Sequence, residues 1–122
     1  MYNQMVVDEL TQDEADQVFH ALADATRRDI VVRVLGAERS VSALAEHYPM
    51  SFAAVQKHVA VLERAGLVAK RRRGREQLVR GEVDTVRRAG LLLDQLDALW
   101  RARMDRFGDV LAEDLDDEGA PR

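Results

Sequence analysis

The chain of 122 residues contains no cysteine, which excludes disulfide bonds, thiolate metal sites and cysteine nucleophiles. No apolar run approaches the roughly 20 residues needed to span a bilayer, and the N-terminal MYNQMVVDEL lacks the basic and apolar segments of an export signal. We therefore expect a cytoplasmic protein with no membrane partner. Aromatic residues make up only 5% of the chain and charged residues 33%, a composition that indicates a helical globular protein.

Signatures of catalysis are also missing. The chain has no glycine-rich phosphate loop, no nucleophile elbow and no pair of carboxylates placed for acid–base chemistry. Its three histidines, His20, His47 and His58, lack the spacing of metal ligands, since no two lie four residues apart around a carboxylate. We therefore expect neither an enzyme nor a protein that needs a cofactor or a metal ion.

Positive charge is concentrated in one stretch, although the whole chain carries a formal net charge of −4. Residues 57–80 contain eight basic and two acidic residues, and the run KRRRGRE at 70–76 supplies five of the basic ones. This asymmetry favours a polyanionic partner, while a solvated basic face is the ordinary alternative. Acidic residues gather at both ends, so we expect an arm at 1–10, one domain at 11–108 and a disordered acidic tail at 109–122.

Helix start and stop signals follow one another closely between residues 11 and 66. Each predicted helix has a capping residue at its start, and all but the first end at a glycine or proline. In chain order these signals are Thr11 with Glu14 as a capping box, Asp24 or Thr26, Gly36, Ser42, Pro49, Ser51 and Gly66. In the helix after Ser51, the spacing of Phe52, Val55, Val59 and Leu62 predicts one buried stripe.

After residue 66 the pattern changes to two extended stretches that flank Gly74, which predicts a β-hairpin with its tip at residues 73–75. The helical period returns from residue 84. The apolar stripe of this last helix consists of Leu93, Leu96, Leu99, Trp100, Met104 and Phe107. Because the stripe lies beyond a minimal fold, we expect it to form a dimer interface rather than to cover its own core.

A short helix, a tight turn at residues 48–50 and a longer capped helix form a helix-turn-helix pattern, and the basic hairpin after it makes a winged helix. The predicted fold class is therefore mainly α with a small β-hairpin wing. The start of the second helix would read bases in the major groove of double-stranded DNA, since Gln56 can pair with adenine and Lys57 with guanine or phosphate. The candidate base-reading residues are Ser51, Ala53, Ala54, Gln56 and Lys57.

The wing supplies most of the candidate phosphate contacts, which would position the protein without reading sequence. These candidates are His58, Lys70, Arg71, Arg72, Arg73 and Arg75. For His58 a second interpretation stays open, because it lies next to the buried stripe and can equally be a polar group satisfied within the fold.

Four segments together resemble the ArsR family of bacterial winged-helix transcriptional repressors. They are ALADATRR at 21–28, SVSALAE at 40–46, KHVAVLERAGLV at 57–68 and RRGRE at 72–76. The resemblance covers roughly residues 17–107 and implies a homodimer joined through its first and last helices, so Val18 joins the stripe residues as a candidate interface residue. It also implies repression at a pseudo-palindromic operator and release by an effector, here an unidentified small molecule.

The chain departs from this family's pattern at several positions. Ala25 stands where proline is frequent, and Gln56 stands where serine is common, which points to a different operator preference. The cysteines of the metal sensors are absent and the last helix has no histidine, so the chain resembles the branch without metal sites. Two alternatives remain: a metal-responsive repressor with a non-cysteine site, and a winged helix that docks proteins rather than DNA.

Overall fold

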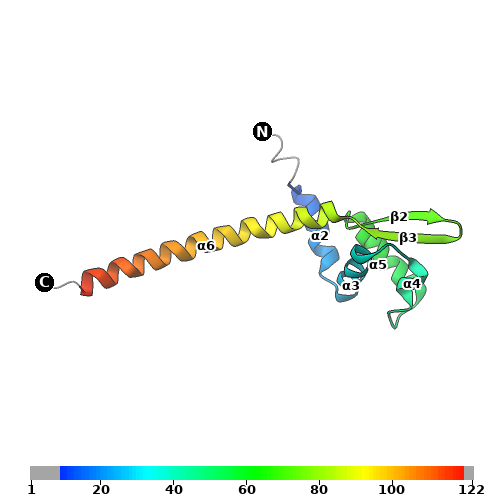
Figure 1. The fold of residues 1–122 in the computed structure, drawn as a ribbon, viewed down its shortest axis with the longest axis horizontal. Coiled ribbons are helices and arrows are strands. Elements are labelled where there is room, and N and C mark those ends of the chain that lie inside the picture. The colour runs from blue at the N-terminus through cyan, green and yellow to red at the C-terminus, as the bar shows by residue number, and fades with distance from the viewer. Residues whose placement is uncertain (1–8, 120–122) are drawn as a thin grey trace. The chain divides into compact units, whose positions relative to one another are not determined.

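The computed structural model describes residues 9–119, which form helices and one small antiparallel sheet (Figure 1). This confirms the predicted fold class. The elements are α2 (Gln12–Leu22), α3 (Ala25–Gly36), β1 (Arg39–Ser40), α4 (Val41–Ala45), α5 (Phe52–Arg64), β2 (Val68–Arg73), β3 (Glu76–Gly81) and α6 (Val83–Gly119). Most of the predicted arm at 1–10 lies outside the described residues, as do residues 120–122 of the predicted tail.

Side-chain caps fix where the helices begin, because they satisfy backbone N–H groups that the first turn leaves without partners. Thr11 and Glu14 form the predicted capping box, with hydrogen bonds of 2.8 and 3.1 Å. The cap of α4 differs from the prediction: the Oγ of Ser40, not of Ser42, accepts a hydrogen bond from the backbone N–H of Ala43 at 3.0 Å. The extended backbone of Ser40 brings its hydroxyl over the first turn, whereas Ser42 already lies inside the helix.

The sheet has three strands in the order β1-β3-β2, all antiparallel. The hairpin of β2 and β3 confirms the predicted wing, and its two-residue turn has Gly74 at the first central position with φ +62°. Strand β1 was not predicted. Its two residues are too few to show the alternation of apolar and polar side chains that marks a strand. They form a strand only by pairing with Val79 and Leu78 of β3.

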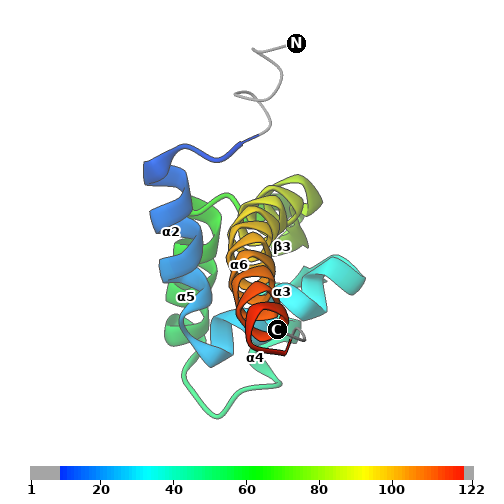
Figure 2. The same ribbon diagram turned by 90° about the vertical axis from the view of Figure 1, so that its left-hand side faces the viewer.

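The core lies between the helices and the base of the sheet. Its largest fully buried side chains are Ile30, Leu44, Leu62, Leu67, Val18, Val55, Val59 and Val79. In Figure 2, α2 runs beside α5, so the two helices cover this core together. The predicted stripe of α5 is confirmed except at Phe52, which is 46% exposed because it is the first residue of the helix and lies past the edge of the core.

The chain divides into two compact units between Ala89 and Gly90. Helix α6 begins in the first unit and forms the second. The domain bounds predicted at 11–108 stay a prediction, whereas the segment predicted as a disordered tail is helical as far as Gly119. Val110, Leu111 and Leu115 continue the apolar spacing of this helix, and leucine, alanine and glutamate between them favour helical backbone.

Candidate nucleic-acid interface

The turn between α4 and α5 is fastened to α3 by a tyrosine. The hydroxyl of Tyr48 donates a hydrogen bond to Oδ2 of Asp29 at 2.6 Å, and Nε of Arg33 donates to the same oxygen at 2.8 Å. The hydrogen bond from Tyr48 is the main cause that lowers the pKa of Asp29. The pKa of Tyr48 is raised to about 12, mainly by burial and next by its hydrogen bond to Asp29. At neutral pH this pair is therefore a phenol that donates to a carboxylate. The hydrogen bond holds the start of α5 in place.

The candidate base-reading residues lie at the start of α5, and most of them face solvent. Ala53, Gln56 and Lys57 are exposed, and Ala54 is half-buried. The hydroxyl of Ser51 is occupied within the fold, because its Oγ accepts a hydrogen bond from the backbone N–H of Ala54 at 3.1 Å. The structure thus leaves the side chains of Gln56 and Lys57 as the polar groups best placed to meet a base.

Gln56 lies on the side of α5 that faces the wing. It lines a shallow hollow together with Val41, Val59, Lys70 and Gln77. Gln77 comes from β3, two residues before the buried Val79, so the alternation of the strand points it to the same face of the sheet. Sequence reasoning missed Gln77; the strand alternation together with Lys70, which pairs with Val79, is the signal that would have found it.

The five basic residues of the run at 70–76 fall into two groups. Lys70 forms an ion pair of 3.3 Å with Glu63 at the end of α5, and Arg71 forms a two-pronged pair with Glu38 at 2.8 and 2.9 Å. The hydrogen bonds from Arg71 are the first cause that lowers the pKa of the Glu38 carboxyl. These two residues brace the wing against the rest of the first unit, so their charges are partly neutralised before any DNA arrives.

The other three arginines of this run remain available. Arg72, Arg73 and Arg75 are exposed, and among residues 9–115 no carboxylate lies within ion-pair distance of them. They occupy the last two positions of β2 and the turn, so they form the tip of the hairpin. An exposed guanidinium without an ion pair suits a phosphate contact because it breaks no internal ion pair on binding.

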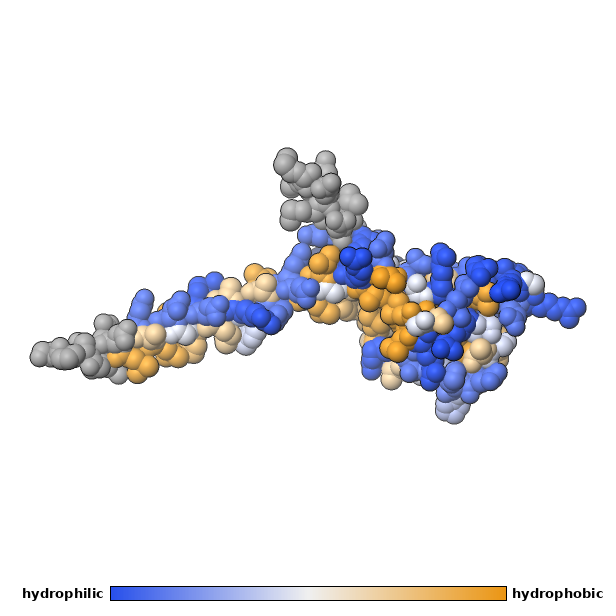
Figure 3. All heavy atoms as spheres, in the orientation of Figure 1, coloured by the Kyte–Doolittle hydropathy of each residue, from blue (hydrophilic) through white to orange (hydrophobic). Residues whose placement is uncertain are grey.

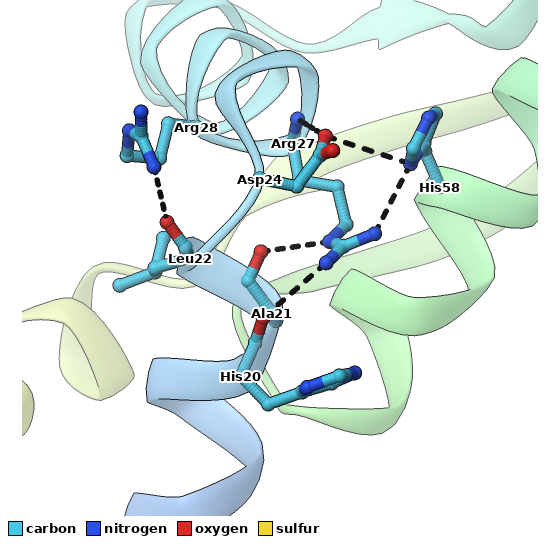
Figure 4. A network of polar contacts seen from close by, with 7 residues as sticks. All are labelled: His20, Ala21, Leu22, Asp24, Arg27, Arg28 and His58. Atoms are coloured by element: carbon cyan, nitrogen blue, oxygen red, sulfur yellow. Dashed lines mark hydrogen bonds and ion pairs between the residues drawn. The ribbon is translucent and has the colours of Figure 1, made fainter.

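His58 belongs to a polar network that joins α5 to the junction of α2 and α3 (Figure 4). Nη1 of Arg27 lies 3.3 Å from Nδ1 of His58, and Oδ2 of Asp24 lies 3.9 Å from the same nitrogen. Because a guanidinium can only donate, Nδ1 of His58 acts as the acceptor. The structure therefore favours the second interpretation of His58, a polar group satisfied within the fold, over a phosphate contact.

Arg27 also completes the end of α2. Its Nε donates to the backbone oxygen of Ala21 at 2.8 Å and its Nη2 to that of His20 at 3.3 Å, while Arg28 donates to Leu22 O at 2.7 Å. These carbonyls lie in the last turn of the helix, where backbone donors run out. The backbone N–H of Ala23 reaches only the oxygen of His20, at 3.1 Å, so the arginines supply the donors for Ala21 and Leu22. The arginines of the ALADATRR segment thus hold two helices and the recognition helix α5 together, a role that the sequence alone did not reveal.

Comparison with known proteins identifies the family. Residues 24–70, from the start of α3 into β2, match the model of "Bacterial regulatory protein, arsR family". The HTH-type transcriptional regulator Rv2034 of Mycobacterium tuberculosis is 34% identical over 107 residues, which cover 88% of this chain and 97% of the relative. The chain belongs to the ArsR family. It is accordingly a transcriptional regulator with a helix-turn-helix DNA-binding domain.

Other bacterial regulators show a similar fold or a related sequence. An ArsR-like regulator from Rhodococcus sp. RHA1 has a TM-score of 0.70 and 32% identity, over 80% of this chain and 92% of that one. The homodimeric winged helix-turn-helix domain of Mb0332 from Mycobacterium bovis has a TM-score of 0.59 and 30% identity, over 70% of this chain and 80% of that one. The repressor SdpR of Bacillus subtilis is 30% identical over 48% of this chain and 66% of its own length.

The predicted interface residues of this ArsR-family chain divide sharply by position. The six stripe residues of α6, Leu93 to Phe107, are 39–69% exposed, and hydrophobic residues follow the helix as an orange band in Figure 3. Val18 instead has no exposed surface and belongs to the core. The structure does not support the interface role predicted for Val18, because this residue lies on the face of α2 that packs inward.

The structure also bears on metal binding and on membrane insertion. Within the part of the chain that the structure describes, no three histidine, aspartate or glutamate side chains come together to hold a metal ion. None of the helices between residues 9 and 119 is long and apolar enough to cross a membrane.

Proposed function

We propose that this ArsR-family regulator binds a pseudo-palindromic operator as a homodimer and represses transcription there. The observation that carries the proposal is the pairing of two surfaces in one unit. A capped α5 presents Gln56 and Lys57 beside small residues, and the adjacent wing presents three unpaired arginines. The first surface suits base edges in the major groove and the second suits phosphates on the flanking backbone.

The candidate contacts have separate roles. Gln56 would make a two-pronged hydrogen bond to an adenine, and Lys57 would reach a guanine or a phosphate, while Ala53 lets the helix approach the groove. Arg72, Arg73 and Arg75 would hold the phosphates. We do not extend this role to Lys70 and Arg71, because both are already paired with carboxylates.

The proposed dimer supplies the spacing that a palindromic operator needs. Two recognition helices read successive major grooves when they lie about 34 Å apart. The exposed stripe of α6 is the surface we propose for association, since exposed apolar residues in a continuous band are typical of protein contacts. The homodimeric domain of Mb0332 supports this proposal.

Repression, rather than activation or catalysis, is the proposed outcome. SdpR, a partial relative, is a transcriptional repressor, and a dimer seated on an operator excludes other proteins from the same DNA. We propose that the protein acts in the bacterial cytoplasm without enzymatic activity, and that a small molecule releases it from DNA.

The base-reading role of Gln56 is tested by selecting bound sites from a pool of random duplexes and then measuring affinities. Gln56→Ala should weaken binding to the selected site by about 1–3 kcal/mol and leave binding to unrelated DNA nearly unchanged. Gln12→Ala, which removes an exposed glutamine from the start of α2, is the control and should change neither affinity. An equal loss on both kinds of DNA would show that Gln56 does not read bases.

The proposed dimer is tested by placing charges on the α6 stripe. Leu96→Asp with Leu99→Asp should produce monomers in sedimentation, because two carboxylates would have to be buried in an apolar contact. The matched control is Ala98→Asp with Ala102→Asp, which adds the same charges to exposed positions on the other side of the helix. A dimer that persists in the first variant would contradict the assignment of the interface.

A further inference from the structure

A second hollow lies between α2 and the end of α5. Its volume is about 170 Å³, roughly the space that five or six water molecules occupy in the liquid. Pockets for drug-sized molecules measure about 300 Å³ or more, so this one admits only a smaller molecule. The residues that line it are Gln17, His20, Val61, Arg64 and Ala65.

The two helices form this hollow because they run side by side and each turns residues one helical turn apart toward the other (Figure 2). Val18, which follows Gln17, and Leu62, which follows Val61, have no exposed surface. The hollow therefore lies at the edge of the core. The polar residues that line it are exposed, so a small molecule can enter from the solvent.

The hollow contains a cation that the fold does not neutralise. Arg64 is exposed, and among residues 9–115 it forms no ion pair. In the described part of the chain, no carboxylate is among the residues that line the hollow. His20 contributes its imidazole, which extends toward α5, while its backbone oxygen accepts a hydrogen bond from Arg27 (Figure 4). An anion bound here would meet a guanidinium that breaks no internal ion pair to receive it.

The charge and the shape of the hollow together define the ligand. A guanidinium presents parallel N–H groups that match the two oxygens of a carboxylate. The amide of Gln17 and a ring N–H of His20 can donate to the remaining lone pairs. Val61 and Ala65 are apolar and half-buried, so they suit a single ring or a short hydrocarbon chain. The hollow thus fits a small monocarboxylate with an apolar body.

A ligand in this hollow contacts the recognition helix α5. Arg64 lies eight positions after Gln56, or about 12 Å along the helix. At the other wall, the backbone oxygen of His20 accepts from Nη2 of Arg27 at 3.3 Å, and Nη1 of this arginine lies 3.3 Å from Nδ1 of His58. A ligand that moves His20 or Arg64 therefore acts on α5 near its middle and at its end. Its negative charge also opposes DNA phosphates at the start of α5, because the screening length in 0.1 M salt is about 10 Å.

We propose that the hollow between α2 and α5 binds a small monocarboxylate, and that this ligand weakens the binding of α5 to DNA. The ligand achieves this by binding the free protein more tightly than the DNA-bound protein, since only such a difference can shift the equilibrium. The inference rests on the proposed operator binding. It adds the site and the chemical class of the small molecule that releases the protein.

The site is tested by NMR titration of the isotope-labelled, full-length protein with benzoate and with isovalerate. At least one of them should shift the amide signals of residues 17–20 and 61–65 and reach saturation. Two control ligands should bind about tenfold more weakly: benzamide, which resembles benzoate but is uncharged, and inorganic phosphate, which is charged but has no apolar body. Arg64→Gln should weaken binding of the carboxylate by about tenfold. Arg87→Gln, which removes another exposed arginine, should leave it unchanged.

Three results of the titration would overturn the proposal. They are the absence of shifts with both carboxylates, shifts confined to other residues, and phosphate binding as tight as that of the carboxylates. An equal loss of binding in Arg64→Gln and Arg87→Gln would also contradict it, because the ligand would then respond to net charge rather than to Arg64.

The effect on DNA is measured on a duplex selected from a random pool. Saturating carboxylate should lower the affinity of the unmodified chain for this duplex by about fivefold or more. At the same concentration the affinity of Arg64→Gln should change much less. An unchanged affinity while the NMR signals show a filled hollow would overturn the coupling. A chain that selects no duplex would instead refute the proposed function, and the titration would still show whether the hollow binds a carboxylate.

Discussion

The division of the wing into paired and unpaired basic residues predicts how binding depends on salt. Replacing Arg72, Arg73 and Arg75 with alanine removes the three guanidiniums that have no carboxylate partner among the described residues. It leaves the pairs that brace the wing, Lys70 with Glu63 and Arg71 with Glu38, unchanged. We therefore expect a folded protein with an intact hairpin and a weaker hold on DNA.

The size of the effect follows from the release of counterions. Each phosphate neutralised on duplex DNA adds about 0.9 to the slope of log affinity against log salt concentration. If each of the three arginines of a protomer contacts one phosphate, their loss lowers the slope by about 2.7 for each half-site. Between 50 and 200 mM salt the wild-type affinity should then fall by about 40-fold more, per half-site, than that of the variant.

The measurement is a titration of a short duplex at several salt concentrations, and it needs no knowledge of the operator because phosphate contacts do not depend on sequence. The control is Arg71→Ala with Glu38→Ala, which removes one pair and leaves the net charge unchanged. It should keep nearly the full slope. A slope that the triple variant leaves unchanged, or a similar drop in the control, would refute the division of the wing.

Two other predictions concern stability. Gly81→Ala should lower the free energy of unfolding in urea by about 1–3 kcal/mol, because a Cβ there would lie 2.6 Å from Cδ2 and 3.1 Å from Cα of Leu35. Gly90→Ala, where nothing lies within 4 Å of the new carbon, is the control, and an equal loss in both would contradict the packing argument. Hydrogen bonds hold the pKa values of four carboxyl groups below their ordinary values, those of Glu14, Asp24, Asp29 and Glu38. These carboxylates therefore stabilise the folded chain fully above the unfolded pKa of about 4. Their contribution is lost as the pH falls through the lower pKa values of the folded state. Urea unfolding at a series of pH values should show this loss, Asp29→Asn should reduce it, and a flat profile from pH 5 to pH 2 would contradict it.

Local signals predicted the parts of the fold that depend on neighbouring residues. The capping box of Thr11 and Glu14, the cap at Ser51 and the glycine turn of the wing each involve groups within a few positions of one another, and all are present. The error at Ser42 was also local: two serines lay close together, and only the backbone of Ser40 is extended. The burial of Phe52 failed for a different reason, since periodicity gives the direction of a side chain but not where the core ends.

The features that the sequence did not predict join residues far apart in the chain. The pair of Arg71 with Glu38 spans 33 positions and the contact of Arg27 with His58 spans 31. Strand β1 exists only through its pairing with β3. Charge alone therefore marked all five basic residues of the run at 70–76 as equivalent, and only the fold separates the two that brace the wing from the three that have no ion pair.

The recognition helix α5 is held at three places along its length. Tyr48 fastens the turn before it, Arg27 contacts His58 near its middle, and Lys70 pairs with Glu63 near its end. A helix secured in this way is preorganised, so little conformational entropy remains to be lost when it enters a groove. We expect recognition by docking of a rigid surface rather than by induced fit, with discrimination between sites expressed in how slowly the complex dissociates.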